Sequence, residues 1–192
     1  MKNEIEIRLL NVDVDLFIKN ITKLGAKKVG SFFQRRYVYD FNPVNKNKWI
    51  RLRTNGEKTT LTIKEIVDRD AIDGTRELEM EVSDFETTGS ILNELGYFHR
   101  NYQENYREIY TLNDVEISID SWPLIPTYVE LEAQSEDNIN SLLRVIEYDK
   151  NDATTLDVVS IYQKIYGIDI LSIKELKFSD EKSVLEHNKQ MQ

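Results

Sequence analysis

A strict alternation of apolar and polar, mostly charged, residues, repeated in six segments, is the feature that most constrains how this chain folds. The first segment reads Glu4-Ile5-Glu6-Ile7-Arg8-Leu9. Successive side chains of a β-strand point to opposite faces of the sheet, so each segment predicts a strand with one apolar and one charged face. Asn55-Gly56 is a strong β-hairpin signal between two of the segments. The other five segments lie around residues 50–53, 61–64, 77–82, 115–120 and 129–132.

Helix signals interrupt the strands at two places. Asp13 precedes a helical stretch that stops at Gly25, and Asp84 opens a second helix that ends at Leu95-Gly96. Few glycines and prolines occur, which leaves little room for linkers and predicts one domain over residues 1–178, with a polar tail over 179–192. We expect further strands at 27–41, 48–54, 58–67, 97–111, 114–121 and 127–134, and C-terminal helices near 135–147 and 155–166.

A faint internal repeat groups these elements into two halves. Each half reads as a strand, a helix and an antiparallel meander. The first copy is Glu4-Ile5-Glu6-Ile7, a helix ending Leu24-Gly25 and Gln34-Arg35-Arg36-Tyr37; the second is Glu77-Leu78-Glu79-Met80, a helix ending Leu95-Gly96 and Gln103-Glu104-Asn105-Tyr106. Two such halves supply about eight strands, the number at which a sheet can close into a small barrel.

The charged faces allow two interpretations. In the first, the sheet is half-buried and its polar face is simply solvated. In the second, the amphipathic helices cover the apolar faces, and the sheet closes with its charges pointing into a lumen. The second interpretation is favoured because acidic pairs and basic residues are segregated on different strands. Such a lumen would hold about eight carboxylates and five or more cations, and it must contain water, metal ions and a polyanion because unpaired buried charges are costly.

This inventory of charges suits one class of ligand. Carboxylates two residues apart on a strand lie on one face, about 7 Å apart, and can share an oxygen-ligated divalent cation. Arg51 and Arg53 place two guanidinium groups side by side, as phosphate oxygens require. Metal ions with Arg and Lys clamps are what phosphoryl transfer needs. We therefore expect a linear triphosphate, free or attached to a nucleoside.

Composition excludes several other functions. The chain has no cysteine and two histidines, so disulfides, thiol nucleophiles and His-rich metal sites are excluded, and a metal must bind oxygen ligands. The 25 Lys and Arg residues against 34 Asp and Glu residues argue against a general nucleic-acid binder. No run approaches a membrane helix and the first residues are not a signal peptide, which predicts a cytoplasmic protein that acts without a membrane.

Several of these segments resemble the signatures of the CYTH superfamily, the triphosphate tunnel metalloenzymes. Glu4-Ile5-Glu6-Ile7-Arg8 is similar to the ExExK signature of that superfamily. Within it, the chain looks most like the branch of class IV adenylate cyclases (CyaB-type) and thiamine triphosphatases. The similarity continues, in order, through Ile50–Arg53, Leu61–Lys64, Thr75–Val82, Tyr106–Tyr110, Ile117–Asp120 and Tyr128–Glu132, and covers roughly residues 1–170.

The resemblance implies an α+β fold, a closed eight-stranded antiparallel barrel with a charged lumen and helices packed outside. It also implies Mg²⁺ or Mn²⁺ as cofactor and a small-molecule triphosphate as substrate. By position it implies metal ligands at Glu4, Glu6, Glu77, Glu79, Glu81, Asp120, Glu130 and Glu132. It implies phosphate-binding residues at Arg8, Arg36, Arg51, Arg53, Lys64 and Arg107, with Arg8, Glu6 and Lys64 taking part in catalysis. Two residues depart from the family pattern: Arg8 replaces the signature lysine, and Asn105 stands where many members have lysine.

Three functions remain open at this point: a metal-dependent triphosphatase, an adenylate cyclase that releases pyrophosphate, and a non-catalytic polyphosphate or nucleotide sensor. We expect a monomer or homodimer that does not bind nucleic acid. We also interpret Trp122-Pro123-Leu124-Ile125-Pro126 as a rigid loop that packs over one rim of the barrel.

Overall fold

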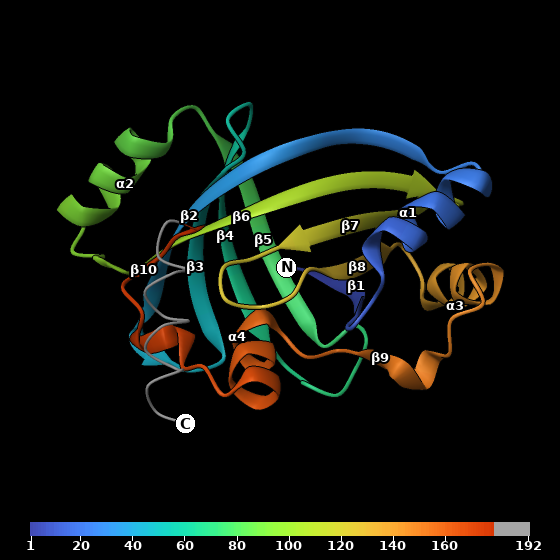
Figure 1. Cartoon of the computed structure of the whole chain (residues 1–192). Helices are drawn as coiled ribbons and strands as arrows, with labels where there is room; N and C mark the ends of the chain where they lie inside the picture. Colours follow the sequence, from blue (N-terminus) through green and yellow to red (C-terminus); the bar gives the residue numbers. More distant parts are fainter. Residues whose placement is uncertain (179–192) are drawn as a thin grey trace, which may run out of the picture.

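Eight strands form one closed antiparallel barrel in the computed structural model, which describes residues 1–178 (Figure 1). The predicted tail, 179–192, lies outside the described residues. The strands are β1 (Lys2–Leu9), β2 (Lys27–Asn45), β3 (Lys48–Thr54), β4 (Thr59–Ile66), β5 (Thr75–Val82), β6 (His99–Leu112), β7 (Val115–Ser121) and β8 (Tyr128–Ala133). Around the barrel their order is β2-β3-β4-β5-β1-β8-β7-β6, and β6 pairs with β2 to close it. The predicted fold class is thereby confirmed.

The helices lie outside the barrel (Figure 1). Asp13 caps the first by accepting a hydrogen bond from the Leu16 amide, and Asp84 caps the second at the Thr87 amide, as their positions in the sequence predict. The predicted helix at 155–166 is instead a single turn that continues into the π-helical turn Ile161–Ile165. The helices are α1 (Val14–Lys23), α2 (Phe85–Glu94), α3 (Glu136–Val145) and α4 (Val158–Ser160).

The predicted two-half organisation is visible in the topology. In each half a first strand is followed by a helix and a three-stranded meander, β2-β3-β4 in one half and β6-β7-β8 in the other. Each meander then pairs with the first strand of the opposite half, β4 with β5 and β8 with β1. Two further short strands join the sheet: β9 (Ala153–Thr154) pairs with β1, and β10 (Glu175–Leu176) pairs with β6.

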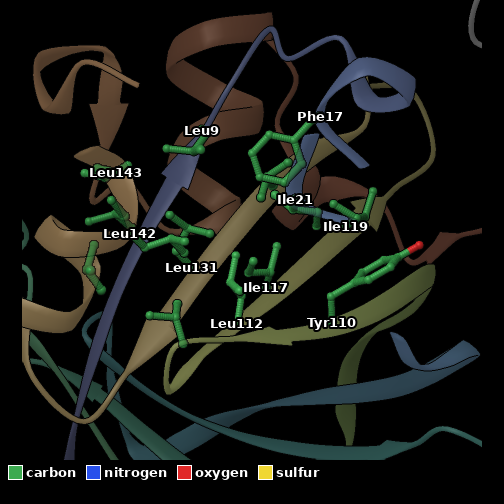
Figure 2. Packing of buried hydrophobic residues seen from close by; sticks show 14 residues of the cluster. Leu9, Phe17, Ile21, Tyr110, Leu112, Ile117, Ile119, Leu131, Leu142 and Leu143 are labelled. Atoms are coloured by element: carbon green, nitrogen blue, oxygen red, sulfur yellow. The ribbon is translucent and has the colours of Figure 1, made fainter. Parts of the chain in front are cut away.

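The hydrophobic core lies between the outer face of the barrel and the helices (Figure 2). Phe17 and Ile21 of α1, with Leu142 of α3, pack on the apolar faces of β1, β6, β7 and β8. Phe85 and Leu92 of α2 pack on β2 and β3. Because a strand that buries its apolar face outward must turn its other face inward, this packing sends the charged residues into the lumen.

A third cluster packs the C-terminal segments against the β7–β8 loop. Trp122 and Tyr128 belong to one buried cluster with Ile161 and Tyr162. The Trp122 and Tyr162 rings meet edge to face, and the Tyr162 hydroxyl donates a hydrogen bond to the Pro123 carbonyl at 2.5 Å. The loop is therefore packed as the sequence predicts.

The outer face of β5 departs from the expectation that helices cover every apolar face. Leu78 and Met80 are 57% and 60% exposed. Strand β1 pairs with β5 through three residues, Lys2 to Glu4, and β5 continues beyond that pairing. Within residues 1–178, no helix is long and apolar enough to span a bilayer.

Candidate functional site

The lumen gathers the charged side chains from strands that are distant in sequence. Glu4 and Arg8 of β1, Arg36 of β2, Asp120 of β7 and Glu130 of β8 are all less than 9% exposed. The register places Glu6 opposite Glu132 and Arg8 opposite Glu130, although more than 120 residues separate the paired strands. The charged lumen predicted from the alternation is therefore present.

Arg8 lies between two carboxylates. Its Nη2 atom is 2.9 Å from Glu6 Oε1 and 2.7 Å from Glu130 Oε2, and its Nη1 donates to the Leu156 carbonyl at 2.9 Å. Burial alone would lower the pKa of Arg8, but Glu6 and Glu130 raise it well above its ordinary value. Arg8 therefore carries a fixed positive charge at every working pH.

Arg107 forms a second link across the lumen. Its guanidinium donates two hydrogen bonds to Asp120, at 2.8 and 2.5 Å, and a third to Glu130 at 3.0 Å. Burial would raise the pKa of Glu130, but Arg8 and Arg107 hold it well below its ordinary value. Burial raises the pKa of Asp120 despite its contact with Arg107. The four groups form one charged network that joins β1, β6, β7 and β8.

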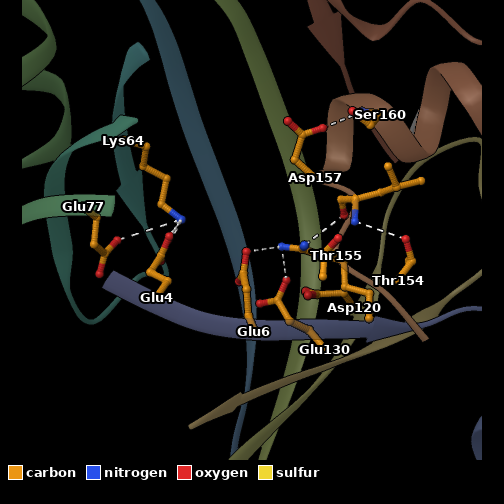
Figure 3. A network of polar contacts seen from close by, with 12 residues as sticks. Glu4, Glu6, Lys64, Glu77, Asp120, Glu130, Thr154, Thr155, Asp157 and Ser160 are labelled. Carbon is orange, nitrogen blue, oxygen red and sulfur yellow. Dashed lines mark hydrogen bonds and ion pairs between the residues drawn. The ribbon is translucent and has the colours of Figure 1, made fainter. Parts of the chain in front are cut away.

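Lys64 and the carboxylates of β5 form a third group of ion pairs. The Lys64 Nζ atom is 2.7 Å from Glu4 Oε2 and 3.9 Å from Glu77 (Figure 3). Two residues further along β5, the Glu79 carboxylate lies 3.4 Å from Arg51 and 3.9 Å from Arg53. Glu81 pairs with Lys58 instead, at 3.1 Å, and both of these side chains are mostly exposed, so Glu81 lies at the edge of the predicted site.

The opposite wall of the lumen is basic. Arg36 of β2 and Arg53 of β3 are directly paired in the register, with Arg51 beside them. Arg51 first, then burial and Arg107, lower the pKa of Arg53 to about 9. Burial and the three neighbouring arginines also lower the pKa of Arg36 well below its ordinary value. Four mutually repelling guanidinium groups around one space attract negative charge, and an anion with several charges would compensate them.

Glu132 marks the acidic end of the lumen. Burial, together with Glu130, Glu6, Glu4 and Glu116, raises its pKa to about 7. Among the described residues no Lys or Arg lies within ion-pair distance of Glu132. Carboxylate oxygens are the ligands that Mg²⁺ and Mn²⁺ prefer, so Glu132 and the carboxylates around it have the donor chemistry of a hard divalent ion.

The same carboxylates are not arranged as a finished metal site. In the described part of the chain no three Asp, Glu or His side chains surround a common point. Arg8 and Lys64 are inserted between the predicted ligands instead. A divalent ion at Glu6 and Glu132 would therefore require Glu6 to turn away from Arg8.

A cavity of about 130 Å³ opens at the β3–β4 hairpin end of the lumen. Arg53, Lys58 and Arg107 line it on the basic side, and Glu116 lines it on the acidic side. Arginines from the basic wall therefore reach a space that communicates with solvent.

Sequence reasoning gave no site role to four residues of this lumen, although it singled out Asn105 as a departure from the family pattern. Gln34 and Asn105 are buried and bond to Arg36; Thr62 donates to Glu79 at 2.7 Å. Tyr128 is 2% exposed, and its hydroxyl has no hydrogen-bond partner among the described residues. Burial, Asp120 and Glu130 raise the pKa of Tyr128 well above its ordinary value, so the hydroxyl keeps its proton. The period of two predicts that these side chains point inward. They were not selected as candidates because they are uncharged, and the candidates were chosen for their charge.

Comparisons with known proteins agree with this geometry. Residues 2–158 match the CYTH domain family. A protein of Methanocaldococcus jannaschii, provisionally named an adenylate cyclase, is 30% identical over 150 residues, which are 75% of this chain and 83% of the relative. A solved structure from Pyrococcus horikoshii OT3 is 25% identical with a TM-score of 0.68, covering 79% of this chain and 94% of the other. A Vibrio parahaemolyticus structure, also provisionally named an adenylate cyclase, has a TM-score of 0.69 at 14% identity and covers 87% and 99% of the two chains, which shows the shared fold alone.

Proposed function

Because the chain belongs to the CYTH domain family, we propose that it is a divalent-metal-dependent enzyme that processes a triphosphate inside its barrel. The observation that carries this proposal is the basic wall. Arg36 is buried beside Arg53, whose side chain is 22% exposed. Burial and then the neighbouring arginines lower the pKa of Arg36, and Arg51 and then burial lower that of Arg53. A buried cluster of like charges is unfavourable unless an anion compensates it, and a chain of phosphates carries enough negative charge to do so.

The basic wall and the acidic wall of the lumen have different roles. Arg36, Arg51, Arg53 and Arg107 bind and orient the phosphates, which fixes the reacting phosphorus relative to its attacking oxygen. Glu4, Glu6, Glu130 and Glu132 would hold Mg²⁺ or Mn²⁺, which when bound neutralises charge on the phosphate oxygens. In the absence of a metal ion, burial and the neighbouring carboxylates raise the pKa of Glu132 to about 7, and burial raises that of Tyr128, whose hydroxyl stays protonated. Arg8 keeps its charge and serves as a fixed cation.

Two reactions fit this arrangement. Attack of water on a terminal phosphorus releases orthophosphate; attack of the ATP 3′-hydroxyl on the α-phosphorus releases pyrophosphate and forms cyclic AMP. Both need the same phosphate clamp. The name of the Methanocaldococcus relative favours the cyclase as the first activity to test.

The test is an incubation of the purified protein with ATP, tripolyphosphate and thiamine triphosphate, with Mg²⁺ and then Mn²⁺. Cyclic AMP with pyrophosphate identifies a cyclase, and orthophosphate identifies a triphosphatase. Tight binding without turnover would leave a sensor and reject the enzymatic proposal. Neither binding nor turnover of any of the three would reject the triphosphate site altogether.

A further inference from the structure

Arg36 differs from the other cations of the lumen in its partners. Arg8, Arg51, Arg53, Lys64 and Arg107 each lie within 4.0 Å of a carboxylate. Arg36 has no carboxylate within that distance among the described residues. Its Nη2 atom donates to Gln34 Oε1 at 3.0 Å and to Asn105 Oδ1, and its guanidinium carbon lies 4.5 Å from the centre of the Trp122 ring. All three partners are neutral.

Asn105 also keeps Arg36 away from the nearest acid. While its oxygen accepts from Arg36, its Nδ2 atom donates to Asp120 Oδ1 at 3.0 Å. Asp120 in turn is held by two hydrogen bonds from Arg107. Since an amide has one donating and one accepting end, Asn105 can bridge an arginine and an aspartate without adding charge. Asn105 is fully buried, so this bridge is shielded from water.

We infer that Gln34 and Asn105 are positioning residues, which hold the Arg36 guanidinium in place while leaving its positive charge for a phosphate group of the substrate. An amide oxygen fixes a guanidinium by hydrogen bonding but leaves its net charge at +1. A carboxylate at the same place would fix the group equally well and cancel that charge. The Trp122 ring supports the cation from the side, because the face of an indole attracts positive charge. This inference rests on the proposed triphosphate site.

Gln34 offers the sharper test, because glutamate and methionine have nearly the same shape as glutamine. Gln34→Glu places a carboxylate on Arg36, whereas Gln34→Met removes the hydrogen bond without adding charge. Tripolyphosphate is titrated against each protein by calorimetry, with and without Mg²⁺. Gln34→Glu is expected to bind at least about tenfold more weakly than Gln34→Met, the effect of losing one charge-assisted contact.

Two further measurements separate positioning from simple packing. Lowering the pH protonates the introduced carboxyl, so the deficit of Gln34→Glu relative to the wild type should shrink, while that of Gln34→Met should not change. In an Arg36→Gln background, Gln34→Glu should cost much less binding than it does alone, because the charge that it cancels is gone.

The outcomes also distinguish this inference from the proposed function. A wild-type protein that fails to bind tripolyphosphate overturns the proposed function. If the wild type binds and the two Gln34 variants are equally affected, or Gln34→Glu is as costly without Arg36, the positioning role is wrong. Circular dichroism and thermal unfolding verify that each variant is folded. Should Gln34→Glu not fold, Gln34→Met is compared alone and in the Arg36→Gln background, where its cost in binding should disappear if Gln34 acts through Arg36.

Discussion

At the scale of single residues, the charged side chains of the lumen differ in how well a neighbouring charge compensates them. Arg8 contacts two carboxylates and a backbone carbonyl, and its side chain is 6% exposed. Glu132 shows the opposite condition, since it is crowded by carboxylates and has no cation within ion-pair distance among the described residues. Removing the Arg8 side chain should therefore destabilise the folded protein, whereas neutralising Glu132 should stabilise it.

Arg8→Ala leaves Glu6 and Glu130 facing each other in a buried space. The loss of one partner from a buried ion pair is expected to lower the free energy of unfolding by about 3–5 kcal/mol near pH 7. Chemical denaturation measures this change. The control is Lys150→Ala, which breaks an exposed pair of 2.7 Å with Glu136 and should cost less than about 1 kcal/mol. Equal effects of the two substitutions would contradict the assigned role of Arg8.

The raised pKa of Glu132 predicts how the free energy of unfolding depends on pH. Its pKa is about 7 in the folded chain and about 4.3 when unfolded, so the folded state binds more protons between these values. Its contribution to stability is therefore present below pH 4 and is lost as the pH rises toward 7. Glu132→Gln should be more stable than the wild type at pH 8, by about 1–3 kcal/mol, and should differ little at pH 4. Urea denaturation at both pH values measures the difference; an equal difference at the two values would refute the assignment.

At the scale of elements, one face of each strand packs outward and the other lines the lumen. Helices α1, α2 and α3 bury the outward faces of six strands, whereas the outer face of β5 has two strongly exposed apolar side chains. The contribution of a leucine to the free energy of unfolding should therefore depend on whether its side chain is buried between a helix and the barrel or exposed on β5.

Leu142→Ala in α3 and Leu78→Ala in β5 make the same chemical change at two different places. Leu142 is 1% exposed, and its truncation should cost about 2–5 kcal/mol. Leu78 is 57% exposed, and its truncation should change stability by about 0.5 kcal/mol or less. Denaturation midpoints of the two variants measure the contrast. A large loss at Leu78 would show that another chain covers this face in solution.

At the scale of the whole molecule, apolar packing lies outside the barrel and charge lies inside it. Many lumen carboxylates already have a cation within 4 Å, and the three apolar clusters do not involve the predicted metal ligands. The fold should consequently not depend on a metal.

Removal of divalent ions by EDTA should abolish turnover and leave the barrel folded. The far-UV circular dichroism should be unchanged, and the free energy of unfolding should fall by less than about 1 kcal/mol, unlike that of a domain built around a structural metal. Adding back Mg²⁺ should raise the melting temperature of the wild type and not that of Glu6→Gln/Glu132→Gln, since a ligand stabilises only the state that binds it. Unfolding in EDTA would show that the carboxylates have a structural role.

The sequence by itself determined which residues share a face of each strand, because the period of two is a local property of a strand. That period, with the segregation of acidic and basic strands, predicted the charged lumen with Glu6, Arg53 and Glu132 inside it, and the internal repeat predicted the two-half organisation. Helix starts at Asp13 and Asp84 were equally predictable, since capping depends on a few neighbouring residues.

The tertiary structure alone decided which charges meet. Arg8 lies between Glu6 and Glu130, and Arg36 is held by Gln34 and Asn105, because strand order and register bring together side chains from distant parts of the chain. The proposed roles of Gln34 and Asn105 depend on their hydrogen bonds to Arg36, so the sequence pattern alone could not predict them. The exposed face of β5 was equally hidden, because the coverage of a strand depends on where the helices pack and not on the strand's own sequence.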